Sequence, residues 1–326
     1  MTMRFFPTGA AIGYNCVMKD PARDRFPSYL PLWYRTFLYA RKVYRQTAVR
    51  LAESAAAKRP LDPLLADEDG IQAVSGSRQA VNPSGVLTKC GRWFEEDLRQ
   101  PAVQVVAERI LALQAHLESR ELRYTNTAGN FLRRQYHPDS EYGKLWENAW
   151  VLAHAAVAPG QRALDVGGAS TIFSFYLASL GCDTVVVDND WANCGTLYNA
   201  NYVAHRMGWR LKALDRDVQN PLPFPASSFD RVFSICVLEH LPPGLRQSLM
   251  REMGRVLKPG GVAGFTTDYD GVRPVLITDK GLRFAYKTKL ERDVFQPSGL
   301  ALYGGADWTD AYPPETFLGA FFLQKP

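Results

Sequence analysis

The stretch "RALDVGGASTIFSFYLASLGCDTVVVDND", residues 162–190, constrains the fold of this chain most. It predicts four elements in order. A short apolar run predicts a strand and two glycines predict a turn, after which an apolar run of helical length predicts a helix and a third run, ending in an acid, predicts a second strand. A helix between two strands lets them pair in parallel. Parallel sheets are covered by helices on both faces, so this stretch predicts an α/β fold.

The same alternation continues from residue 141 to residue 326. Further strands are expected at residues 211–217, 229–236, 261–268 and 316–325, and further helices at 141–157, 194–208, 243–257 and near 279–292. This order predicts a doubly wound, largely parallel sheet. Ligands of such sheets bind outside the carboxyl ends of the strands, where the strand order reverses.

The first 140 residues have a different pattern. Two amphipathic helices are expected, over residues 33–51 and 93–120, and the Pro-, Gly-, Ser- and Asp-rich residues 58–85 between them predict a loop. The second helix has an apolar side made of Val103, Val106, Ile110, Leu113 and Leu117. We therefore predict a helical N-terminal domain, residues 1–140, acting as a lid or in a homodimer, and a ligand-binding domain, residues 141–326.

Composition excludes several classes of protein. The net charge of +5 is spread along the 326 residues, whereas a nucleic-acid-binding face would need it concentrated, so charge alone does not decide this question. No window approaches the run of about 20 apolar residues that a membrane span needs, so we expect a cytoplasmic protein. The five cysteines form no C-x-x-C pair, and "DEDG" at residues 67–70 lacks the spacing of a calcium loop, so no metal is expected.

The glycine turn indicates a polar ligand held close to the backbone. Gly167, Gly168 and the small Ala169 leave room there, and the following helix presents free N–H groups. The dinucleotide pattern G-x-G-x-x-G would need further glycines at positions 169 and 172, which are Ala169 and Ile172. The turn therefore leaves NAD as the second candidate for the ligand.

Two acids end the strands on either side of this turn. Asp165 would repel a pyrophosphate but suits a ligand with an ammonium group. Asp188 ends the second strand, where a carboxylate can accept both hydroxyls of a ribose. Acids at strand ends also occur as solvated residues or helix caps.

Two more motifs follow in order, "LDRDVQNPLPFPASSFDRVFSICVLEHL" and "MGRVLKPGGVAGFTT". Together with the turn and its acids, they resemble the class I, Rossmann-like S-adenosylmethionine-dependent methyltransferases, especially those that act on small molecules. The resemblance covers about Leu164 to Thr267. The chain departs from the family pattern at Ala169 and Thr171, where the family usually has glycine.

The resemblance implies a cofactor, S-adenosylmethionine, and the residues that hold it. Its methionine part would lie on the glycine turn, its ribose on the acid that ends the second strand, and its adenine beside the next two loops. The residues so implied are Asp165, Gly167, Gly168, Ala169, Asp188, Asn189, Asp217, Val218 and Cys236. Cys236 would offer its backbone carbonyl, with its side chain packed as a small apolar residue.

Candidates for catalysis are few. A hydroxyl acceptor gains from a general base, and His240, just after the fourth strand, is the leading one, although it could equally cap the next helix. His137, Asp268 and Asp270 follow, each also readable as a surface residue. A neutral amine acceptor needs no base beyond water.

Three functions remain open from the sequence. The first is methyl transfer to an oxygen or nitrogen atom of a small molecule, for example a secondary metabolite. The second is methylation of RNA or DNA, against which the fourth strand ends in "CVLEHL" and lacks the Asn/Asp-Pro-Pro-aromatic motif that grips a flipped base. The third is a non-catalytic, cofactor-binding scaffold subunit.

Overall fold

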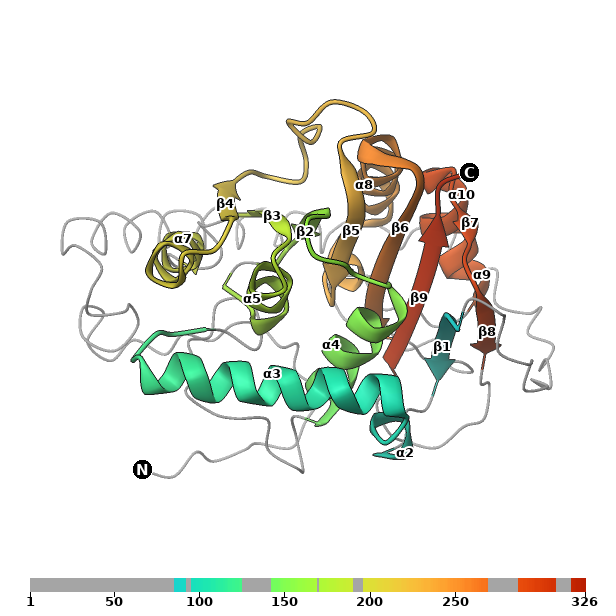
Figure 1. The fold of residues 1–326 in the computed structure, drawn as a ribbon. Coiled ribbons are helices and arrows are strands. Elements are labelled where there is room, and N and C mark those ends of the chain that lie inside the picture. Colours follow the sequence, from blue (N-terminus) through green and yellow to red (C-terminus); the bar gives the residue numbers. More distant parts are fainter. Residues whose placement is uncertain are drawn as a thin grey trace, which may run out of the picture.

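The computed structural model describes residues 85–91, 95–124, 142–168, 170–189, 196–268, 287–308 and 318–326. These residues form a nine-stranded sheet with helices on both faces (Figure 1). The first expected helix, residues 33–51, lies outside the described residues, as does almost all of the expected loop at 58–85.

Five parallel strands make up the half of the sheet that carries the motifs. In spatial order they are β4 (Leu211–Asp215), β3 (Asp183–Asp188), β2 (Arg162–Val166), β5 (Phe229–Ile235) and β6 (Leu257–Asp268). All four neighbouring pairs are parallel, which confirms the doubly wound arrangement. The order reverses between β2 and β5, so this is where a ligand is expected.

The other half of the sheet contains one expected strand and three that the sequence did not predict. Its strands are β9 (Leu318–Gln324), β1 (Leu87–Gly91), β8 (Gly305–Trp308) and the short β7 (Ala301–Leu302). β1 pairs antiparallel with β9 and parallel with β8. The part of the chain before residue 140 therefore contributes a strand as well as helices to the fold.

Helices cover the sheet in two layers. α3 (Pro101–Ser119), α4 (Tyr142–His154), α5 (Ile172–Ser179) and α7 (Thr196–Met207) share one apolar core, and α2 (Glu95–Leu98) precedes α3. α8 (Pro243–Val256) packs in a second core with the C-terminal helical segment: α9 (Lys287–Leu290), a π-helical turn η3 (Glu291–Phe295) and α10 (Gln296–Ser298). β3 shows the alternation behind this layering, because Val186 faces the first core and Val185 and Val187 face the second.

α3 confirms the expected amphipathic helix. Val103, Ile110 and Leu117 are fully buried, and Val106 and Leu113 pack against the same core. α3 thus belongs to the core of the sheet domain and is not a separate unit. In the C-terminal part, residues 279–286 of the helix expected near 279–292 lie outside the described residues, and the described helical residues run from 287 to 298.

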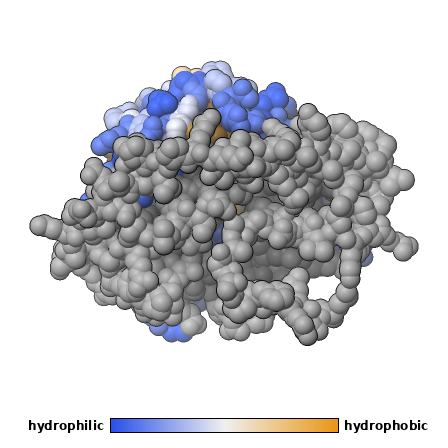
Figure 2. Space-filling view, turned by 180° about the vertical axis from the view of Figure 1, so that it is seen from behind, coloured by the Kyte–Doolittle hydropathy of each residue, from blue (hydrophilic) through white to orange (hydrophobic). Residues whose placement is uncertain are grey.

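The described surface that is visible from behind is mostly hydrophilic (Figure 2). Among the helices of the described ranges, none is long and apolar enough to cross a membrane.

Candidate active site

The glycine turn follows β2 at the strand-order reversal, and close packing requires its glycines. Gly167 has a φ of +83°, and a Cβ there would overlap the side chain of Val237, the second residue after β5. A Cβ on Gly168 would overlap the carboxylate of Asp165. The turn therefore brings the ends of β2 and β5 into contact. Thr171 then begins α5, where its side chain accepts a hydrogen bond from the Ser174 N–H.

Asp165 is fully buried beneath this turn. The Ser174 hydroxyl donates to its Oδ2 at 2.5 Å, while its Oδ1 has no hydrogen-bond partner among the described residues. Burial raises the pKa of Asp165 to about 7. The Ser174 hydrogen bond opposes this shift, and the charge of Asp188 adds to it. A buried acid with an unpaired oxygen favours a cationic ligand, because the cation would stabilise its ionised form.

Asp188 and Asp217 lie along the same edge of the sheet. Asp188 ends β3, and its Oδ1 accepts the backbone N–H of Asn189 at 2.6 Å, which fixes the orientation of the carboxylate. Asp215, the last residue of β4, pairs with Asp188 in the sheet. Asp217 follows two residues later in a turn, where its Oδ1 accepts the Gln219 N–H at 3.0 Å. Val218, next to it, packs on the second core.

Cys236, the first residue after β5, lies in a polar cluster instead of the expected apolar packing. Its φ is +53°, in the left-handed region, and its N–H donates to the Thr266 hydroxyl at 3.0 Å. The thiol donates to Glu147 Oε1 at 2.7 Å, and the Lys144 ammonium donates to the sulfur at 2.8 Å and pairs with Glu147 Oε2 at 2.6 Å. This Lys144–Glu147–Cys236 cluster joins the start of α4 to the end of β5.

The charges of this cluster are held in place by one another. Burial alone would lower the pKa of Lys144, but Glu147 and Cys236 raise it well above its ordinary value, so Lys144 stays a cation. Burial and the charge of Glu147 raise the pKa of the Cys236 thiol, which therefore stays protonated and donates a hydrogen bond. The cluster is an ion pair bridged by a neutral thiol.

His240 lies close to this edge as well. It is the last residue of the short helical turn η2 (Leu238–His240), four residues after Cys236, and its side chain is exposed. Its N–H donates to the Val237 carbonyl at 2.9 Å. The structure thus places His240 just beyond the residue that covers the glycine turn.

Comparison with known proteins identifies the domain. Residues 164–265 match the family described as "Methyltransferase domain". The chain carries a class I, Rossmann-like S-adenosylmethionine-dependent methyltransferase domain.

Two curated relatives and one solved structure illustrate the similarity. A sterol 24-C-methyltransferase of Pneumocystis carinii is 31% identical over 119 residues, 35% of this chain and 29% of its own length. An uncharacterized methyltransferase of Synechocystis sp. is 31% identical over 118 residues, 34% of this chain and 49% of its own. The chain thus spans less than half the length of either relative. The solved structure of the [4+2]-cyclase SpnF shares the fold, with 17% identity and a TM-score of 0.50 over 69% of this chain and 97% of that one.

The residues of the methyltransferase domain fit the cofactor that its family uses. S-adenosylmethionine carries an ammonium group, which suits the unpaired oxygen of buried Asp165, and a ribose, which suits a carboxylate at the end of β3. Gly167 and Gly168 pack against Val237 and Asp165, so only glycine lets the turn lie this close to the buried carboxylate. Among the described residues, no group of three or more His, Cys, Asp or Glu side chains is placed to hold a metal ion.

Some expected residues fall outside the described part, and two others were missed. His137, Ala169 and Asp270 are not described, and of Asp268 only the backbone is, pairing with Leu318 in β9. Lys144 and Glu147 were not singled out from the sequence. One signal was available: an acid inside the apolar run Leu145–Val151, flanked by two tryptophans, needs a buried partner.

Proposed function

We propose that this protein transfers a methyl group from S-adenosylmethionine to an oxygen or nitrogen atom of a small molecule. The observation that carries the proposal is the buried Asp165 beneath a glycine turn, at the strand-order reversal of a methyltransferase domain. An acid so placed has an unpaired oxygen and a pKa near 7, which a bound ammonium group would lower.

The residues around the turn would hold the cofactor in three places. Asp165 would bind its ammonium group, Asp188 its ribose hydroxyls, and the loop of Asp217 and Val218 its adenine. When bound, the cofactor supplies a methyl group already activated by its sulfonium. The protein's own task is then to orient the acceptor and exclude water, which can lower a barrier by roughly 7 to 11 kcal/mol.

The residues after β5 would act on the acceptor. His240 would accept the proton of a hydroxyl acceptor, because its imidazole is exposed at this edge. The backbone carbonyl of Cys236 would line the same space. The Lys144–Glu147–Cys236 cluster would keep the end of β5 in its left-handed conformation.

A small-molecule acceptor is supported by two observations. The P. carinii relative is named for methylation of a sterol, which is a small molecule. The name refers to a carbon atom, so carbon acceptors should be tested besides oxygen and nitrogen. The segment after β5 is "CVLEHL", without the base-gripping motif of amine-methylating nucleic-acid enzymes. Of the residues before 140, those outside β1, α2 and α3 would form a lid over the acceptor or a homodimer contact.

Calorimetry tests the cofactor and mass spectrometry tests the reaction. We expect binding of S-adenosylmethionine and of its demethylated product, and no binding of NAD. Incubation with phenols, amines and sterols should then give one product heavier by one methyl group. Tight NAD binding with no binding of either sulfur compound would refute the cofactor. Cofactor binding without methyl transfer to any acceptor, including RNA, would favour the scaffold.

A further inference from the structure

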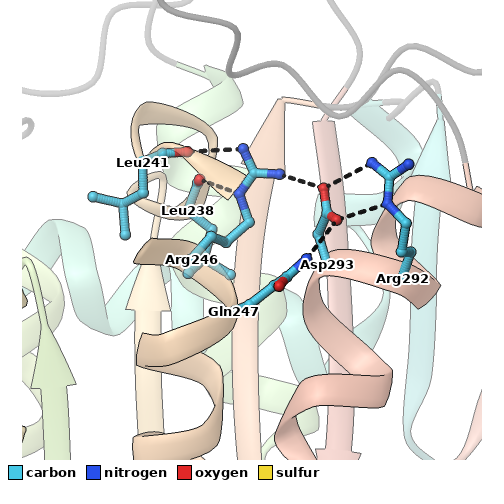
Figure 3. Close-up of polar contacts among 6 residues, drawn as sticks. All are labelled: Leu238, Leu241, Arg246, Gln247, Arg292 and Asp293. Atoms are coloured by element: carbon cyan, nitrogen blue, oxygen red, sulfur yellow. Dashed lines mark hydrogen bonds and ion pairs between the residues drawn. The ribbon is translucent and has the colours of Figure 1, made fainter. Parts of the chain in front are cut away.

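A buried arginine fixes the turn that carries His240. Arg246, on α8, is only 2% exposed. Its Nε donates to the Leu238 carbonyl and its Nη2 to the Leu241 carbonyl, both at 2.9 Å (Figure 3). These two carbonyls bracket Glu239 and His240. The guanidinium therefore spans the turn and determines where its carbonyls lie.

The other side of Arg246 is anchored by the C-terminal helical segment. Its Nη1 donates to Asp293 Oδ2 at 2.9 Å, and Asp293 is also 2% exposed (Figure 3). Gln247 Nε2 and Arg292 Nε donate to Asp293 Oδ1 at 3.3 and 2.8 Å. Asp293 lies in η3, a π-helical turn, and such turns are frequent at functional sites.

Burial makes this arrangement depend on each partner. Burial lowers the pKa of Arg246 to about 10, although the charges of Asp293 and Glu239 partly oppose this shift. Arg246 is therefore still a cation at neutral pH. A buried cation needs a counter-charge and full hydrogen bonding. A lysine could not replace it, because a single ammonium lacks the planar fork that reaches two carbonyls and a carboxylate together.

We propose that Arg246 is a positioning residue for methyl transfer: it holds the Leu238–Leu241 turn so that His240 meets the acceptor, and Asp293 orients Arg246. The inference rests on the proposed role of His240 as the base. It links residues 287–298 to the reaction, although they lie outside the sequence motifs of the domain. Misplacement of a reacting group by about 1 Å can lower the rate a hundredfold, so the position of the His240 turn matters for the reaction.

α8 itself offers a matched control. Arg255 lies nine residues after Arg246 and makes the same kind of fork, from Nη1 and Nη2 to the carbonyls of Phe224 and Leu222 at 2.8 and 3.1 Å. It also pairs with Glu252 at 2.7 Å. Its loop follows β4 and carries the candidate cofactor residues Asp217 and Val218 but not His240, and the Arg255 side chain is 36% exposed against 3% for Arg246. Arg255→Lys therefore removes an equivalent fork without disturbing the turn of His240.

The first experiment needs no acceptor. Hydrogen exchange of the full chain should show faster exchange of the His240 and Leu241 amides in Arg246→Lys, about tenfold or more, and unchanged exchange there in Arg255→Lys. Asp293→Asn should act in the same direction more weakly, and it replaces Arg246→Lys should that variant not fold. Unchanged exchange of both amides in a folded Arg246→Lys or Asp293→Asn protein would overturn the proposal.

The second experiment uses labelled S-adenosylmethionine with a panel of phenols and catechols. Arg246→Lys should lower kcat about tenfold to hundredfold with the cofactor KM unchanged. At saturating cofactor, Arg255→Lys should keep the wild-type kcat, because its loop carries cofactor residues and not His240. In a His240→Ala background, Arg246→Lys should lower kcat little further, because both substitutions remove the contribution of a correctly placed His240. An equal loss of kcat in both backgrounds would overturn the proposal. No methyl transfer by the wild type would instead contradict the proposed function and leave the exchange result to decide the clamp.

Discussion

Burial determines the chemistry of Asp165. Its pKa is raised to about 7, against about 3.9 for an aspartate in an unfolded chain, so the folded protein retains a proton between these values. Because the folded state binds more protons, the stability of the cofactor-free protein falls as the pH rises from about 4 to 7. Cofactor affinity has the opposite dependence, since an ammonium group binds the ionised carboxylate. It should fall about tenfold per pH unit below 7.

Asp165→Asn should remove both pH dependences. An amide does not titrate, so the unfolding free energy should lose the slope that Asp165 contributes between pH 4 and 7. The affinity for S-adenosylmethionine should be low and nearly constant from pH 5.5 to 8.5. Calorimetry and thermal unfolding across this range check both. A wild-type affinity that does not change below pH 7 would show that Asp165 does not bind the ammonium group.

Asp188→Ala should weaken cofactor binding about tenfold to hundredfold, because a charge-assisted hydrogen bond is worth about 1.5 to 3 kcal/mol. Asp183 is the matched control. It begins the same strand, at the opposite edge of the sheet, and forms a half-exposed ion pair with Arg162 at 3.3 Å. Asp183→Ala should leave the dissociation constant unchanged. Equal effects of the two substitutions would place the ribose elsewhere.

His240→Ala should affect chemistry and not cofactor binding. For a hydroxyl acceptor we expect kcat to fall about a hundredfold or more, with cofactor affinity nearly unchanged. For a neutral amine acceptor the loss should be much smaller. The pH–rate profile is a second measurement, since an imidazole base gives a falling limb on the acid side that the alanine variant lacks. A hydroxyl-methylating enzyme that keeps its rate and profile without His240 would turn attention to Asp268 and His137.

At the scale of elements, the Lys144–Glu147–Cys236 cluster joins α4 to β5. Glu147 is fully buried, while the Lys144 side chain is 26% exposed. Removing one partner of a fully buried pair costs about 3 to 5 kcal/mol. The partial exposure of Lys144 lets water take over part of the lost interaction. Most of the cluster's stabilisation should therefore depend on Glu147.

Glu147→Gln should lower the unfolding free energy by about 2 kcal/mol, because it leaves the Lys144 ammonium without a counter-charge. The ion pair of Lys258 with Asp230, at 2.8 Å and more exposed, is the comparison. Asp230→Asn should cost no more than about 1 kcal/mol. Urea unfolding measures both. A Glu147→Gln protein as stable as wild type would mean that the cluster does not stabilise the junction.

The sequence predicted the elements whose signal is local. β2, β3 and α5 follow from one apolar pattern and one glycine turn, and the acids at their strand ends follow from the same motif. β1 was missed because its five residues carry no distinctive pattern and their partners lie more than 200 residues away in the chain. Lys144 and Glu147 were missed for a related reason. A charged pair three residues apart on a helix usually faces solvent, whereas the contacts with Cys236 show that Glu147 of this pair is buried.

At the scale of the whole molecule, the sheet connects the first and the last segments of the chain that the structure describes. β1 lies between β9 and β8, so it pairs with strands on either side, and α3 packs on α4 in the first core. A division of the chain at residue 140 would remove β1 and α3 together. β8 would lose its parallel neighbour, and the buried side chains of α4 would be exposed to water. Gly85, the first described residue and two residues before β1, is therefore the better boundary for a truncation.

Two truncations separate the role of the N-terminal residues from the integrity of the fold. A chain beginning at Gly85 keeps β1 and α3, so it should unfold cooperatively and bind S-adenosylmethionine with nearly wild-type affinity. A chain beginning at residue 141 should fail to unfold cooperatively, because it loses a sheet strand and the apolar side of α3. If the N-terminal residues form a lid, the Gly85 protein should bind cofactor but lose methyl transfer. If they form a homodimer contact, the Gly85 protein should elute as a monomer from a size-exclusion column. A Gly85 protein with the wild-type turnover rate and the wild-type oligomeric state would exclude both roles. The acceptor site would then be built from residues 85–326 alone.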